Sequence, residues 1–150
     1  MNQLKDIPIA VEGVPPGMAL SHGNTLPLLY EIAILLDDLV ATGKSASIDL
    51  RSLPMLPEDY ETLRAALGEG EVNATVNALG PTQVYETAVH GVWWITHRNA
   101  AGEVIAEFIE VTYSPGILAT HPEDARAAAK MLHSRLARPA PTTQGEDHAG

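Results

Sequence analysis

The stretch EVNATVNALGPTQVYETAVHGVWWITHRNAAGEVIAEFIEVT, residues 71–112, decides the fold because its apolar residues follow a period of two. In VNATVN, residues 72–77, every second side chain is apolar, which is typical of a strand with one buried face. Turn sequences divide the stretch at Leu79-Gly80-Pro81, at His90-Gly91 and at Asn99-Ala100-Ala101-Gly102. We therefore expect an antiparallel meander of four strands, over residues 72–77, 82–89, 92–98 and 103–113.

Helical periodicity precedes this stretch. Leu28, Ile32, Leu35 and Leu39 fall on one face of a helix expected over 26–42, which ends at Gly43. A short strand is expected over 46–50, followed by a second helix over 57–67 that buries Tyr60, Leu63 and Leu67.

A last helix is expected over 120–136. Thr120 and Glu123 fit a capping box, and the packing face would hold Ala125, Ala128, Met131 and Leu132. The resulting order favours an α+β fold, in which a four-stranded antiparallel meander and a short extra strand carry about three helices on one face. Residues 1–21 are expected to form an irregular arm, 22–138 a single domain and 139–150 a disordered tail.

Charge and cysteine content exclude several classes of function. The chain has 150 residues and a formal net charge of −10, which disfavours contact with a nucleic-acid backbone. Four basic side chains in and just after the last helix, Arg126, Lys130, Arg135 and Arg138, favour a solvated helix end instead. Cysteine is absent, so the chain has no disulfide, no thiol nucleophile and no thiolate ligand for zinc or an iron–sulfur cluster.

The expected compartment is the cytoplasm. No window approaches 18 consecutive apolar residues, so no transmembrane helix and no membrane partner are expected. The first residues lack the plan of a secretory signal.

The hairpin over 92–113 supplies candidate binding residues. With 99–102 as its loop, His97 would face Val104 and Trp93 would face Phe108, which gives one core face. The opposite face is mixed, holding Trp94, Thr96, Arg98, Glu103, Ile105, Glu107 and Ile109. We expect it to be semi-exposed, with Trp94, Arg98 and Glu107 available to a partner. Alternatively, the last helix or the N-terminal arm covers Trp94.

Glu86 interrupts the apolar pattern of its strand. On the expected register it shares the core side with Val84, Ile95 and His97. A buried carboxylate must pair or protonate, so a Glu86–His97 contact would form half of an acid–base or metal site. The alternatives are a structural polar contact, or a register that turns Glu86 to solvent.

Arg51 follows the short strand and lies in a leucine-rich turn. Its planar fork could clamp a carboxylate of a partner, or could pin the turn through Asp49 or Glu110. Leu53 belongs either to the core or to an exposed apolar patch. The chain carries no phosphate loop, nucleophile elbow or closely spaced histidine pair, so we expect no metal and no cofactor.

Several short motifs occur in a recognisable order. They are Ile48-Asp49-Leu50-Arg51-Ser52-Leu53-Pro54, Leu67-Gly68-Glu69-Gly70-Glu71-Val72, Glu86-Thr87 and Gly91-Val92-Trp93-Trp94. In this order they resemble the conserved domain of the hydrogenase expression/formation family HupH/HyaF. The resemblance spans roughly residues 26–135 and adds Glu86 to the candidate binding residues.

The resemblance implies a non-enzymatic, chaperone-like protein that serves maturation of an uptake [NiFe] hydrogenase. It implies binding of a hydrogenase subunit, with the iron–sulfur small subunit favoured, or of another maturation protein. Because the family often carries two copies of the domain, one copy here suggests a single-domain relative or a homodimer. The competing hypothesis is a small metal-binding or acid–base protein centred on Glu86 and His97.

Overall fold

The computed structural model of the chain describes residue 23 and residues 25–141, which fall in two compact units divided between Pro115 and Gly116. The first unit holds α1 (Thr25–Thr42), β1 (Ala46–Asp49), the 3₁₀ turn η2 (Leu50–Ser52), α2 (Pro57–Leu67), β2 (Asn73–Asn77), β3 (Pro81–Glu86), β4 (Val92–Arg98) and β5 (Val104–Val111). The second unit holds the 3₁₀ turn η3 (Gly116–Leu118) and α3 (Pro122–Ala137). The expected arm over 1–21 and residues 142–150 of the expected tail lie outside the described residues.

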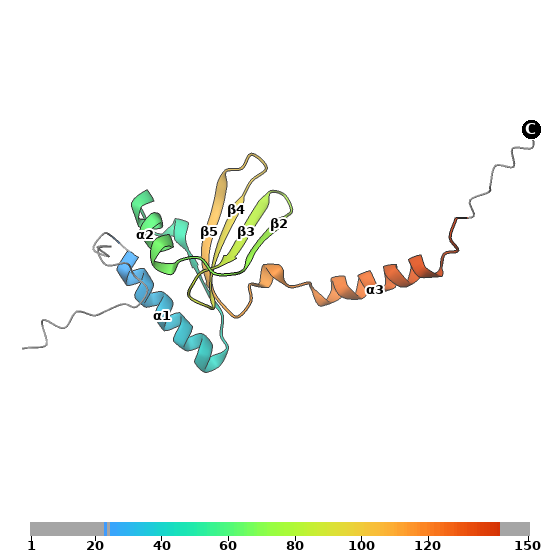
Figure 1. Cartoon of the computed structure of the whole chain (residues 1–150), viewed down its shortest axis with the longest axis horizontal. Helices are drawn as coiled ribbons and strands as arrows, with labels where there is room; N and C mark the ends of the chain where they lie inside the picture. The colour runs from blue at the N-terminus through green and yellow to red at the C-terminus, as the bar shows by residue number, and fades with distance from the viewer. Residues whose placement is uncertain (1–22, 24, 142–150) are drawn as a thin grey trace, which may run out of the picture. The chain divides into compact units, whose positions relative to one another are not determined.

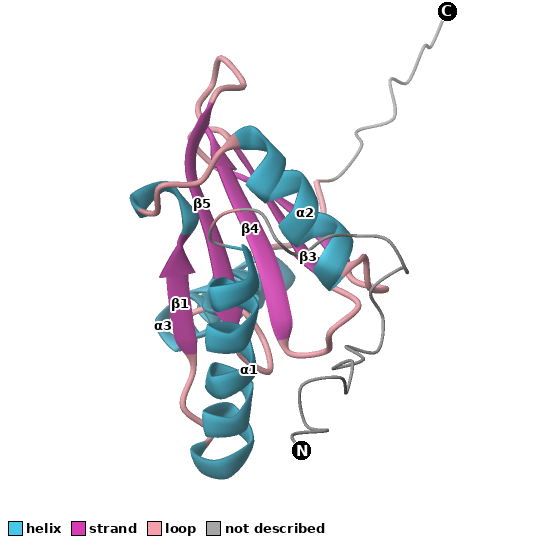
Figure 2. Cartoon of the chain, turned by 90° about the vertical axis from the view of Figure 1, so that its left-hand side faces the viewer, coloured by secondary structure: helices cyan, strands magenta, loops and turns pink. Residues whose placement is uncertain are grey.

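The first unit is a five-stranded antiparallel sheet with two helices on one face (Figures 1 and 2). The strand order is β1-β5-β4-β3-β2, so β2 to β5 form the expected meander. The short extra strand, β1, joins the sheet by pairing with β5. The α+β class is confirmed. Within the described residues, no helix is both long and apolar enough to cross a bilayer.

The main core lies between the sheet and the helices α1 and α2. Leu28, Ile32 and Leu39 of α1 and Leu63 and Leu67 of α2 are buried there, as their periodicity predicts, whereas Tyr60 is only half-buried. The sheet contributes Ile48, Val92, Trp94, Ile109 and Val111.

The face that carries Trp94 is therefore the helix-covered one, and the expectation that it is semi-exposed is wrong. Trp94 is 0% exposed. Its cover is α1 and α2, neither of which was the expected one.

The opposite face of the sheet holds a smaller cluster of Val84, Trp93 and Ile95. The indole of Trp93 donates a hydrogen bond to the carbonyl of Thr112, 3.0 Å away, and this bond holds the ring over the end of β5. Trp93 and Ile95 are buried as expected, although they form the minor core.

The strand registers differ from the expected ones by two residues. In the β4–β5 hairpin, Ile95 faces Phe108 and His97 faces Ala106, where Ala106 and Val104 were expected. The pairing also slips by one residue between His97 and Arg98, which is a β-bulge or a similar irregularity. The two-residue shift preserves the alternation of faces, so the expected faces are correct from Trp93 to His97 and from Ala106 to Ile109. Beyond the slip they are wrong, because Val104 lines a pocket with Glu107 whereas Arg98 and Ile105 line another with His97.

Helix α3 begins two residues later than expected. His121 is its N-cap and makes no side-chain cap bond, so the predicted Thr120 capping box is wrong. None of its residues is buried, and the packing face expected over Ala125 to Leu132 stays a prediction.

Candidate functional site

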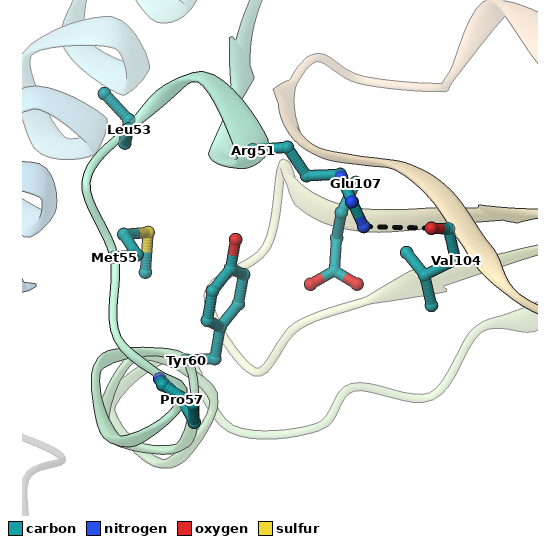
Figure 3. A pocket seen from close by; sticks show the side chains of 7 residues that line it. All are labelled: Arg51, Leu53, Met55, Pro57, Tyr60, Val104 and Glu107. Atoms are coloured by element: carbon teal, nitrogen blue, oxygen red, sulfur yellow. Dashed lines mark hydrogen bonds between the residues drawn. The ribbon is translucent and has the colours of Figure 1, made fainter.

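A groove of about 520 Å³ lies between the segment 51–57, α2 and β5 (Figure 3). We call it the α2–β5 groove. Its lining residues are Arg51, Leu53, Met55, Pro57, Tyr60, Val104 and Glu107. It brings together three of the predicted binding residues, Arg51, Leu53 and Glu107, from segments about fifty residues apart in the sequence.

Arg51 is held at the rim of the groove by local and long-range hydrogen bonds. The Asp49 carboxylate accepts from the backbone N–H of Arg51 at 3.0 Å, which shapes the turn after β1. The guanidinium Nη1 of Arg51 donates to the carbonyl of Val104 at 2.9 Å (Figure 3). Arg51 thus pins the turn to β5, as one alternative predicted, but through a carbonyl and not through the carboxylate of Asp49 or Glu110.

The start of α2 forms a second wall. Leu56 has no side chain that can cap, and the carboxylate of Asp59 instead accepts the backbone N–H of Leu56 at 2.9 Å. One turn of helix then presents Tyr60, whose hydroxyl donates to the carbonyl of Leu50 at 3.2 Å. Burial raises the pKa of Tyr60, the negative charge of Glu107 raises it further, and the Arg51 guanidinium acts in the opposite direction.

Glu107 connects the groove to a polar cluster under α2. Its carboxylate accepts from Thr96 Oγ1 at 3.3 Å and lies 3.8 Å from Nη2 of Arg64. The Arg64 guanidinium stacks over the Trp94 ring, 4.2 Å from the centroid, and donates to the Tyr85 hydroxyl at 2.9 Å. Trp94, although buried, therefore supports the group that faces Glu107.

Tyr85 completes this cluster by stacking on Trp94, with 6.3 Å between ring centroids and 7° between planes. Burial is the main cause that raises the pKa of Tyr85 to about 12; Arg64 opposes the rise and Glu107 adds to it. The folded state therefore holds this proton to higher pH than the unfolded chain does.

The stabilisation from the Tyr85 proton should be complete below pH 10 and should be lost as pH rises from 10 to about 12. Tyr85→Phe should remove a phenolate absorbance step near pH 12 and flatten the fall in stability across that window. Ultraviolet titration with denaturant curves at each pH checks both effects. Tyr30→Phe, at an exposed tyrosine, is the control. If this variant also lacked the absorbance step near pH 12, the assignment of that step to Tyr85 would be wrong.

Glu86 lies in a second pocket of about 200 Å³, on the Arg64 and Tyr85 side of α2. Its carboxylate is 3.6 Å from Nδ1 of His90 and accepts weakly from the Gly91 N–H at 3.4 Å. His97 lies four residues further along the partner strand from the position opposite Glu86, where its Nδ1 contacts Thr82 Oγ1 at 2.8 Å. The Glu86–His97 contact that the competing hypothesis requires is not formed, because the β3–β4 register places Trp93 opposite Glu86. Glu86 instead makes a structural polar contact with His90, as one alternative predicted.

Arg98 lies apart from the α2–β5 groove, near the tip of the β4–β5 hairpin. Its guanidinium donates to the carbonyl of Gly102 at 3.0 Å and closes the turn. It lines a third pocket with Leu79 and Ile105. The structure therefore does not bring Arg98 together with Arg51 and Glu107.

Met55, Tyr60 and Arg64 were missed as site residues. A signal for two of them was present, since Tyr60 and Arg64 are four apart on one helix and so share a face. Met55 stands two residues after Leu53 in an extended segment, which places both on one side. The position of Glu107 beneath Arg64 depends on how β5 pairs in the sheet, and no local sequence signal predicts it.

The chemistry of the groove is that of a binding surface. Tyrosine, arginine and methionine are enriched where proteins contact one another, and here they line one concavity. Among residue 23 and residues 25–141, no group of three or more histidine, aspartate or glutamate side chains could hold a metal ion.

Comparisons with known proteins place this groove in a family domain. The model of the C-terminal conserved region of the HupH hydrogenase expression protein matches residues 23–138. The hydrogenase expression/formation protein HupH of Rhizobium leguminosarum bv. viciae is 33% identical over an alignment of 143 residues, which covers 87% of this chain and 49% of that protein. HoxQ of Azotobacter vinelandii, with the same description, is 32% identical over 69% of this chain and 36% of its own length.

A solved structure agrees with the fold. The hydrogenase expression protein HupH from Thiobacillus denitrificans ATCC 25259 superposes with a TM-score of 0.74 at 49% identity, over 77% of this chain and 97% of that chain. Against the curated relatives, in contrast, this chain spans half of their length or less.

Proposed function

This chain belongs to the family of HupH hydrogenase expression proteins, and from that premise we propose that it is a non-enzymatic accessory protein for maturation of an uptake [NiFe] hydrogenase. It would act in the cytoplasm as a binding module that holds a client protein during assembly. The family match supports this proposal most strongly, because it spans the whole α2–β5 groove.

The proposed client is a hydrogenase subunit or another maturation protein. Among the subunits, the iron–sulfur small subunit is favoured. Because this chain has no cysteine, any thiolate-bound cluster in such a complex would belong to the client. The accessory protein would then supply a surface and not a cluster ligand.

The competing hypothesis of an acid–base or metal site at Glu86 and His97 has lost its geometric basis. The two side chains have separate partners, His90 and Thr82. No observation on the described residues favours it over a binding module.

The tagged full chain, expressed in cells that make an uptake [NiFe] hydrogenase, should co-purify with a hydrogenase subunit or a maturation protein. Arg51→Ala should reduce this recovery by about tenfold, because a buried interface arginine typically contributes 1–2 kcal/mol or more. The matched control is Arg126→Ala on α3, which should leave recovery unchanged. Mass spectrometry identifies the captured proteins, and a wild-type capture without any of them would contradict the proposal.

A further inference from the structure

Glu107 is the buried charge that points into the α2–β5 groove. Its side chain is only 8% exposed, yet the carboxylate is directed into the concavity between Tyr60 and Val104 (Figure 3). Burial of a carboxylate is unfavourable unless strong donors surround it.

The internal partners that the structure gives this carboxylate are both long. Thr96 Oγ1 is 3.3 Å away and Arg64 Nη2 is 3.8 Å away, whereas charge-assisted N–H···O bonds have lengths of about 2.7–2.9 Å. Arg64 is also engaged with the Tyr85 hydroxyl and the Trp94 ring. Glu107 therefore retains capacity for a stronger donor that arrives from the groove.

The other walls fit an apolar group beside that donor. Leu53, Met55, Pro57 and Val104 line the same concavity, and Met55 can adapt its flexible side chain to different shapes. A volume of about 520 Å³ lies within the range of side-chain-sized and small-ligand sites.

Charge decides between the possible occupants. Two charged side chains line the groove: the Arg51 guanidinium already donates to the carbonyl of Val104, whereas the Glu107 carboxylate faces the concavity. The whole chain carries a formal net charge of −10. A positively charged segment is attracted to such a surface, while a second copy of this acidic chain is repelled.

We propose that the α2–β5 groove binds a segment of the client protein that places a lysine or arginine side chain on Glu107 and an adjacent apolar side chain against Leu53 and Met55. This inference names the chemistry of the client and so rests on the proposed function. The incoming cation takes over the carboxylate that Arg64 holds only at 3.8 Å.

A random peptide library displayed on phage, selected against the full chain, tests the preference. Selected peptides should share an internal basic residue next to a large apolar one. Against Glu107→Gln, which preserves shape but removes the charge, the basic preference should disappear while the apolar preference remains. Glu110→Gln, on the opposite sheet face and half-buried, is the matched control and should select the same peptides as the wild type.

A double-mutant cycle tests whether the basic residue of the peptide contacts Glu107 itself. The consensus peptide should bind Glu107→Gln about tenfold more weakly, since a hydrogen bond to a charged group is worth about 1.5 kcal/mol or more. Replacing the basic residue of the peptide by methionine should abolish that difference. Arg64→Gln, which removes the internal competitor, should tighten binding of the same peptide. Thermal unfolding of each variant verifies that it is folded.

Selection of acidic or purely apolar peptides, or an unchanged basic preference in Glu107→Gln, would overturn the inference. This failure is separate from failure of the proposed function. If a hydrogenase subunit is captured and Glu107→Gln does not change its recovery, the proposed function is supported and the proposed role of the groove is rejected. If basic peptides are selected but no hydrogenase protein is captured, the groove's preference is supported and the proposed function is rejected.

Discussion

Trp94→Ala is expected to lower the free energy of unfolding by about 3–5 kcal/mol, the range for removal of a large buried aromatic side chain. Trp94 is 0% exposed and belongs to the main core beneath α1 and α2. Its loss also removes the ring on which Arg64 and Tyr85 stack. Denaturant unfolding followed by circular dichroism measures the change.

Trp94→Phe is the matched variant. It keeps an aromatic ring under Arg64 and removes Nε1, a buried donor for which the described residues provide no acceptor. Its destabilisation should therefore be clearly smaller than that of Trp94→Ala. Equal losses would contradict this account, because phenylalanine leaves a smaller cavity than alanine and keeps a ring under Arg64.

Gly80→Ala is expected to destabilise the protein by about 1–3 kcal/mol, as overpacking against rigid atoms does. A Cβ on Gly80 would lie 2.1 Å from the carbonyl oxygen of Arg98 and 2.8 Å from the carbonyl carbon of Asn99. Both obstacles are backbone, so the β2–β3 turn must move away from the end of β4. Thermal and denaturant unfolding measure the loss.

Gly116→Ala is the control for Gly80→Ala, because nothing lies within 4 Å of its added Cβ and its backbone is not left-handed. It should change stability by a few tenths of a kcal/mol, in the stabilising direction if the loop conformation suits alanine. Similar destabilisation by both substitutions would show that loss of glycine flexibility, and not the clash at Arg98, is responsible.

Local patterns predicted the elements of this fold well. The stripe of Leu28, Ile32 and Leu39 identified α1 because a helix repeats every 3.6 residues, and these three side chains are buried. Alternation over 72–77 identified β2 for the same kind of reason. Both patterns depend only on residues close together in the sequence, so they predict helices and strands without any knowledge of tertiary contacts.

The assignment of the main core failed because polar residues were counted as exposed. Thr96 and Glu107 made the Trp94 face look half-solvated, yet both residues are buried. They are accommodated by one another and by Arg64, which approaches from α2. Such pairing joins distant segments, and no local pattern encodes it.

The candidate site was predicted in part. Arg51, Leu53 and Glu107 do converge in one groove, while Arg98 lies near the hairpin tip and Trp94 lies beneath the surface. Arg98 is separated from Arg51 and Glu107 because the strand pairing slips between His97 and Arg98. Turn sequences alone do not reveal such an irregular pairing. Glu86 and His97 were separated by the register of β3 on β4.

The pairing of β1 with β5 has a consequence for the order of folding. Asp49 pairs with Phe108 across almost sixty residues, whereas β2 to β5 join through short turns. Closure of long loops is entropically costly, so the meander should form first and β1, with the Arg51 turn, should dock late. Docking of Ile48 and Leu50 into the main core then completes the wall that carries Arg51 and Leu53, so the groove is formed only in this last step.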